Sequence, residues 1–213
     1  MSRGERAARR AAASGSGPTH DEPGRNPGAA GALALFGEVL LTGVLVTVCG
    51  LLVVTLPAAL AAGIRHLRRY ARAEGSSMRA FWGDVRAALP GGVVVGLACA
   101  LIAGVLAIDI LLASSGRLPG GELIAGFGWL LAAAVAGILL TASGAWSPES
   151  GWLRAIPSLP SAIGRDIPGF LYLVVAAAFV GLATWMLPPL LIPALGCAAL
   201  AAVAVPERPR RRR

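Results

Sequence analysis

Two long apolar segments joined by an arginine-rich link constrain the fold of this 213-residue chain more than any other feature. The first segment covers residues 32–64, and the second begins after Pro90-Gly91-Gly92. A membrane-spanning helix needs about 20 consecutive apolar residues, so each segment is long enough to cross a bilayer. Soluble helices keep a polar face. A chain with 56% hydrophobic residues and a mean hydropathy of +0.71 is therefore predicted to be an integral membrane protein.

Further apolar segments raise the predicted number of spans to about five, which makes the fold class an all-α, polytopic transmembrane helical bundle. The predicted spans are residues 32–64, 91–114, 122–144, 168–187 and 189–205. The last two meet at Pro188-Pro189 and together are too long for one span, which favours a hairpin with a tight proline turn and leaves a re-entrant pair as the alternative.

Three regions follow from this pattern. Residues 31–205 form the predicted transmembrane domain. Residues 1–30 are rich in Arg, Ala, Ser, Gly and Pro without an apolar period, so we expect a disordered N-terminal tail. Residues 206–213 form a basic C-terminal tail, which next to a span is expected to contact anionic lipid.

Aromatic residues in two of the links predict one or two amphipathic helices on the cytoplasmic membrane surface. Apolar side chains recur at helical spacing from Met78 to Leu89, and Ser76 or Ser77 is a suitable N-cap. We expect a short interfacial helix there, separate from the span that follows. Because aromatic side chains favour the level of the lipid headgroups, the expected interfacial anchors are Phe81, Trp82 and Trp152.

The arginines determine the predicted orientation. With five spans, those of the first link, the third link and the C-terminal tail all fall on one side of the membrane. The positive-inside rule then places the N-terminus outside and the C-terminus in the cytoplasm. All 19 basic residues are arginines in an Ala-, Gly- and Pro-rich chain, which is typical of a GC-rich bacterium and therefore of its cytoplasmic (inner) membrane. Arginines confined to links and tails also argue against nucleic acid as a partner of this chain of net charge +8.

Small residues recur every four positions along the second span. Such a stripe allows another helix to approach closely. Two interpretations stay open: packing within the bundle, or self-association through this span. The residues are Gly92, Gly96, Ala100 and Gly104.

Three acidic residues in or next to the spans are candidates for an intramembrane polar site, since a charge there is costly and often functional. The predicted topology places Glu38, Asp109 and Glu122 toward the outer face, with Asp109 as the key group. Thr42 lies one turn from Glu38, and Arg117 is a candidate counter-ion. These groups either line an outward vestibule for a cation, a proton or sugar hydroxyls, or are hydrated or paired for structural reasons.

The sequence predicts neither an enzyme nor a cofactor. Its three cysteines are scattered through apolar segments without metal-ligand spacing, so no metal site is expected. Nucleotide-binding loops and a nucleophile–base set are also missing from the sequence. We expect His66, which lies among arginines, to be hydrated at the membrane surface.

The first link and its flanks resemble the YesL-like family of bacterial integral membrane proteins. The resemblance begins at Thr55-Leu56-Pro57 and continues through the basic residues of the link. It includes Arg79-Ala80-Phe81-Trp82-Gly83-Asp84-Val85-Arg86 and then a span carrying Asp109. Members are often associated with carbohydrate uptake systems. The resemblance therefore implies an accessory role beside an ABC-type sugar transporter and its permease subunits. The alternative is a small solute or ion transporter or channel that uses the outward-facing acids.

Overall fold

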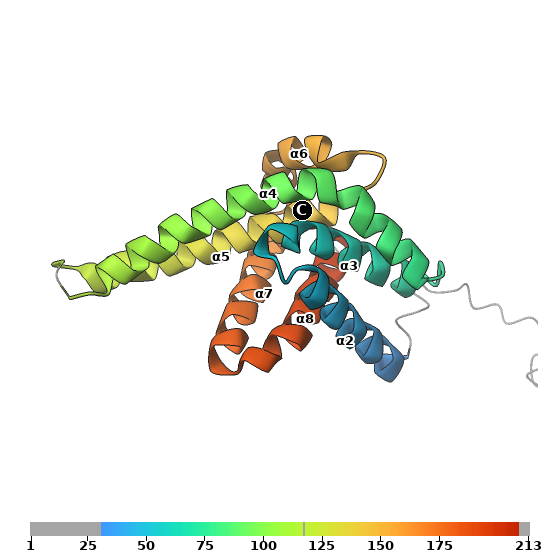
Figure 1. Cartoon of the computed structure of the whole chain (residues 1–213), viewed down its shortest axis with the longest axis horizontal. Helices are drawn as coiled ribbons and strands as arrows, with labels where there is room; N and C mark the ends of the chain where they lie inside the picture. The colour runs from blue at the N-terminus through green and yellow to red at the C-terminus, as the bar shows by residue number, and fades with distance from the viewer. Residues whose placement is uncertain (1–30, 117, 209–213) are drawn as a thin grey trace, which may run out of the picture.

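The computed structural model describes residues 31–116 and 118–208, and these residues form a helical bundle without strands (Figure 1). The predicted tail 1–30, Arg117 and the last five residues lie outside the described residues. The described part confirms the all-α fold class. Its helices are α2 (Ala32–Cys49), α3 (Leu56–Ala71), α4 (Met78–Ala113), α5 (Gly121–Ala145), α6 (Gly151–Arg165), α7 (Ile167–Met186) and α8 (Leu191–Glu207), with short 3-10 helices η2 (Val53–Thr55) and η3 (Pro188–Leu190).

Five segments of the described chain are long and apolar enough to cross a membrane, as predicted. Four are the helices α2, α4, α5 and α7, and the fifth, Pro188–Glu207, combines η3 with α8. Helices α7 and α8 pack against each other, joined by η3 at the Pro188-Pro189 pair, so they form a hairpin. These findings support a multi-pass membrane protein.

The prediction of one span over residues 32–64 is wrong, because two helices occupy this segment. Helix α2 ends at Cys49, and α3 begins at Leu56 after the turn of η2. The Thr55 hydroxyl lies 2.5 Å from the carbonyl oxygen of Cys49 and 2.7 Å from that of Leu52, and its single proton is shared between these two acceptors, which closes the turn. Pro57 then occupies the first turn of α3, where its missing N–H costs nothing.

Helix α3 lies at the buried centre of the bundle and is not among the candidate spans. It packs against α2, α4, α5 and α8, and Ile64 and Leu67 are fully buried. Alanines over most of its first two turns allow the surrounding helices to approach closely. These are Ala58, Ala59, Ala61 and Ala62, all fully buried.

Helix α4 is continuous over 36 residues, so the predicted separate interfacial helix from Met78 to Leu89 is also wrong. Ser77 caps it as expected, since its side chain accepts a hydrogen bond from the Ala80 N–H. Pro90 removes one backbone donor without ending the helix. The turns before the proline are held in place because Phe81, Val85 and Ala88 pack into the core beside α3. The predicted second amphipathic helix is observed as α6.

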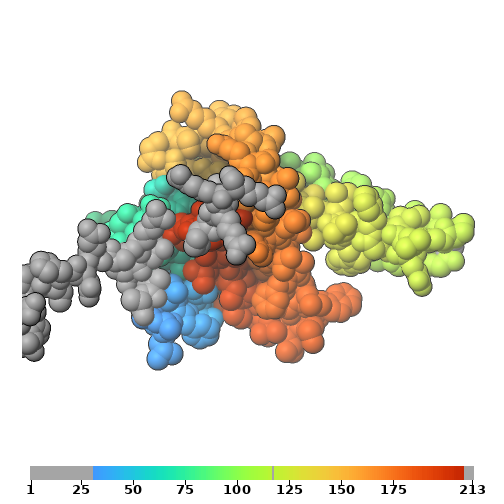
Figure 2. Space-filling model, turned by 180° about the vertical axis from the view of Figure 1, so that it is seen from behind, coloured from blue at the N-terminus to red at the C-terminus, as the bar shows by residue number. Residues whose placement is uncertain are grey.

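The first and last described helices, α2 and α8, cross at two glycines. A Cβ atom added to Gly43 would overlap the carbonyl oxygen of Ile192, and one added to Gly196 would overlap the carbonyl oxygen of Val39. Only glycine permits such a close approach of two backbones. By contrast, the hairpin of α4 and α5 extends well beyond the rest of the bundle (Figures 1 and 2).

Candidate functional site

Polar side chains on the second half of α3 and at its C-cap connect this helix to four surrounding helices. Arg65 and Arg69, spaced one turn apart, reach α4, while His66 reaches α2. Arg68 reaches α5, and Arg72 reaches α8. We call these five residues and their partners the α3 polar cluster. It lies at the end of the bundle that also carries the link between α3 and α4.

Asp84 on α4 is the acid at the centre of the cluster. Its Oδ2 accepts from Arg69 Nη2 and lies 3.4 Å from Arg65 Nε. The Asp84 side chain is only 8% exposed, and the two arginine side chains are 18% and 24% exposed. Ion pairs of this kind offset the cost of removing the charges from water only while both partners are present. Arg65 also lies over the Trp146 ring, 6.0 Å from its centroid.

His66 and Glu38 join α3 to α2. The distance between His66 Nε2 and Glu38 Oε1 is 2.5 Å, and the histidine side chain is 1% exposed. The expected hydration of His66 at the membrane surface is therefore wrong, since Glu38 and the edge-on ring of Phe81 enclose it. Thr42 is fully buried and donates to the Glu38 carbonyl oxygen at 2.8 Å, so it supports the helix backbone instead of the Glu38 carboxylate.

Arg68 and Arg72 complete the α3 polar cluster. Arg68 Nη2 donates to the carbonyl oxygen of Gly144 at 3.1 Å, and Arg72 Nη2 lies 3.2 Å from Glu207 Oε1. Burial lowers the pKa of Arg68, with smaller contributions from the positive charges of Arg72 and Arg65. A guanidinium remains protonated despite such a shift. The hydrogen bonds and ion pairs of the cluster therefore act as a set of ties between helices.

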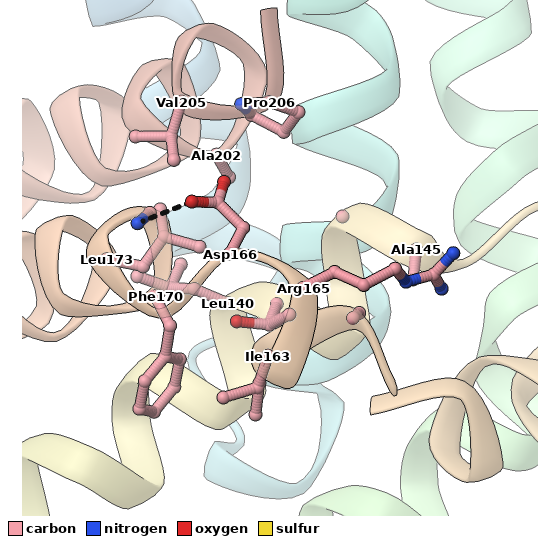
Figure 3. A pocket seen from close by; sticks show the side chains of 14 residues that line it. Leu140, Ala145, Ile163, Arg165, Asp166, Phe170, Leu173, Ala202, Val205 and Pro206 are labelled. Atoms are coloured by element: carbon pink, nitrogen blue, oxygen red, sulfur yellow. Dashed lines mark hydrogen bonds between the residues drawn. The ribbon is translucent and has the colours of Figure 1, made fainter. Parts of the chain in front are cut away.

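A pocket of about 320 Å³ opens near this end of the bundle, between α5, α6, α7 and α8 (Figure 3). Most of its wall is apolar, with Leu140, Phe170 and Leu173 among the lining residues. Its acidic group, Asp166, accepts from the Gly169 N–H at 3.0 Å and forms an ion pair with Arg208. Because protein groups already satisfy this carboxylate, the pocket offers a ligand mainly apolar contact.

The structure separates the acids that were expected to share a vestibule. Asp109 and Glu122 are exposed and lie toward the far end of the α4–α5 hairpin. Glu38 instead bonds to His66 on α3, and Arg117 is outside the described residues. The buried acid pairing that the sequence did not reveal is that of Asp84 with Arg65 and Arg69. The available signal was the spacing of Arg65 and Arg69, which places both on one helix face opposite the acid of the next helix.

Two of the three predicted interfacial anchors lie inside the protein. Phe81 is fully buried, and Trp152 is 5% exposed with its Nε1 donating to the Ala88 carbonyl oxygen at 2.8 Å. The prediction of an interfacial position was wrong for both residues, because the apolar side of each amphipathic segment faces protein rather than lipid. Trp82 is 45% exposed and remains available to the membrane surface.

The small-residue stripe on α4 divides into two halves. Gly92 faces Ala58, and Gly96 lies so close to η2 that an added Cβ would overlap the Val54 carbonyl oxygen. This half serves packing within the bundle. Ala100 is partly buried, while Gly104 is exposed with open space around it.

A second, apolar groove of about 590 Å³ runs between the candidate spans α5 and α7. Small residues form its floor, and Trp129 and Trp185, both largely exposed, border it. The small lining residues are Ala132, Ala133, Ala136, Ala177, Ala178 and Gly181.

The described residues contain no group of three or more His, Cys, Asp or Glu side chains that could hold a metal ion.

The chain was also compared with known proteins. Neither the curated proteins nor the solved structures include a match. A family model described as "Protein of unknown function, DUF624" matches residues 39–110. This third of the chain contains α3, most of α4 and the whole Asp84–Arg65–Arg69 ion-pair set, so the chain is similar to that family over the part that holds these ion pairs.

Proposed function

We propose that this protein is a non-enzymatic membrane component that binds the membrane-spanning subunits of a carbohydrate (ABC-type) uptake system. The groove between α5 and α7 is the observation that carries this proposal. Helices associate in lipid largely through close packing over small side chains, and this groove presents six of them between two spans. The resemblance to the YesL-like family supports a sugar-transport permease as the partner.

A solute pathway through this chain has less support. Such a pathway needs polar groups around a common cavity, whereas Asp109 is exposed on the hairpin and Glu38 bonds to His66. Transport of sugar or ions by the purified protein alone in vesicles would favour this rival. Co-purification of permease subunits, together with impaired sugar uptake in a deletion strain, would support the accessory role.

Filling the groove should release the partner. A Cβ at Gly181 would meet no atom within 4 Å, so Gly181→Leu can occupy the groove without disturbing the fold. Misfitted side chains at a packed contact cost about 1–3 kcal/mol, so we expect recovery of co-purified permease to fall about tenfold or more. Quantitative mass spectrometry of the affinity-purified protein measures this.

Gly126→Leu on α5 is the matched control. Gly126 is also exposed and open, but it lies outside the groove. Partner recovery should be unchanged in this variant. Equal losses in both variants, or no loss with Gly181→Leu, would contradict docking at the groove.

The proposed orientation has the N-terminus outside and the C-terminus in the cytoplasm of a bacterial inner membrane. In a background without Cys49, Cys99 and Cys197, a membrane-impermeant maleimide should label Ser115→Cys in intact cells, because Ser115 lies in the α4–α5 turn. It should label Glu149→Cys, in the α5–α6 link, only after lysis. The reverse labelling pattern would invert the topology.

A further inference from the structure

One stripe of exposed side chains runs along the whole length of α4, and the type of side chain changes along it. Its members recur every three or four residues, so they share one helix face. They are Arg79, Trp82, Arg86, Pro90, Val94, Leu97, Leu101, Val105, Ile108 and Leu112, all exposed. The stripe is basic and aromatic before Pro90 and wholly apolar from Val94 onward.

The length of the apolar part of this stripe matches the thickness of the hydrocarbon core of a bilayer. From Val94 to Leu112 the helix rises about 27 Å, close to the roughly 30 Å of the bilayer hydrocarbon core. Arg79 and Arg86 then lie beyond the core, at the level of the headgroups. Trp82 lies between them, where tryptophan is favoured.

The basic part of the stripe is held in place, and its two arginines form no ion pair with the described residues. The Trp82 ring packs edge-on against Phe81, with 5.6 Å between ring centroids, and Phe81 is fully buried. Asp84, the acid of the same turns, faces inward and pairs with Arg65 and Arg69. Within residues 31–116 and 118–208, neither Arg79 nor Arg86 has an ion-pair partner.

We propose that the face formed by Arg79, Trp82 and Arg86 binds the phosphate group of an anionic phospholipid, whose acyl chains lie along Val94 and Leu97. Guanidinium groups bind phosphate through paired hydrogen bonds. A lipid matches both halves of the stripe, because the apolar half continues on the same helix face. An acidic protein segment would match only the first three turns.

Native mass spectrometry of the full chain in detergent, titrated with phosphatidylglycerol or with phosphatidylcholine, tests this lipid site. The wild type should bind phosphatidylglycerol more tightly. Each of Arg79→Gln and Arg86→Gln should raise its apparent Kd about fivefold, with the Kd for phosphatidylcholine unchanged. The double variant Arg79→Lys with Arg86→Lys keeps both positive charges, so it should retain most of the preference for phosphatidylglycerol over phosphatidylcholine. This variant separates loss of the lipid site from misfolding.

Arg154→Gln is the matched control. Arg154 is an exposed arginine on α6 outside the stripe, so the Kd for phosphatidylglycerol should not change. Equal Kd values for the two lipids in the wild type would overturn the proposal, as would an equal loss in the Arg154 variant. Unchanged lipid binding in the glutamine variants, with loss of an acidic protein partner instead, would assign the face to that protein and also overturn it.

Discussion

Replacing Asp84 with asparagine should lower the free energy of unfolding by about 3 kcal/mol. The change leaves two guanidiniums, mostly enclosed between helices, without their counter-ion, and removing one partner of a buried ion pair typically costs about 3–5 kcal/mol. We expect a loss at the lower end of this range because both arginine side chains keep some contact with water. In a protein of this size the melting temperature in detergent should fall by about 6–12 °C.

Asp109→Asn provides the comparison for this experiment. It makes the same chemical change on the same helix, but Asp109 is exposed near the C-terminal end of α4 and forms no ion pair within residues 31–116 and 118–208. The exchange should therefore not lower the free energy of unfolding by more than about 0.5 kcal/mol. If the melting temperatures of both variants match that of the wild type, solvent screens the Asp84 ion pairs and the α3 polar cluster does not hold the bundle together.

The substitution Gly96→Ala should destabilise the protein by up to about 3 kcal/mol. The new Cβ would lie 2.6 Å from the carbonyl carbon of Val54 and overlap its oxygen. Since these are backbone atoms, no side-chain rotation can relieve the overlap, and α4 must move away from η2. Overpacking of this kind costs about 1–3 kcal/mol. Thermal unfolding in detergent measures the loss.

Gly104→Ala tests the other half of the same stripe. The site is open, so the exchange should be neutral or stabilising by up to about 1 kcal/mol, because alanine favours a helix more than glycine does. A loss comparable to that of Gly96→Ala would show that Gly104 packs against another copy or partner. The molecular mass of the variant, measured by light scattering in detergent, separates these two cases.

Features that depend on composition and run length were predictable from the sequence. The five spans and the amphipathic α6 follow from apolar segments and from the helical spacing around Trp152. The division between α2 and α3 was not predictable in this way, because residues 51–56 are at least as apolar as their flanks. The local signals were Gly50 and Thr55-Leu56-Pro57, which end one helix and begin the next.

The contacts of the candidate site were harder to predict because they depend on which side chains face protein. An amphipathic pattern is the same whether its apolar side lies on lipid or on another helix, so Phe81 and Trp152 could not be assigned from spacing alone. The helical spacing also does not distinguish Asp84 from a solvated charge. Only the packing of α3 against α4 shows that this acid forms ion pairs with Arg65 and Arg69.

The glycine-mediated crossing of α2 with α8 has a consequence for biosynthesis. The partner of the first described helix is the last described helix in chain order, so α2 enters the membrane well before Ile192 and Gly196 are synthesised. At elongation rates of about 5–20 residues per second this interval is on the order of ten seconds. During that time, lipid or the insertion machinery must cover the surface around Gly43. Truncation before α8 should therefore leave a nascent chain whose first helix stays open to quality-control proteases.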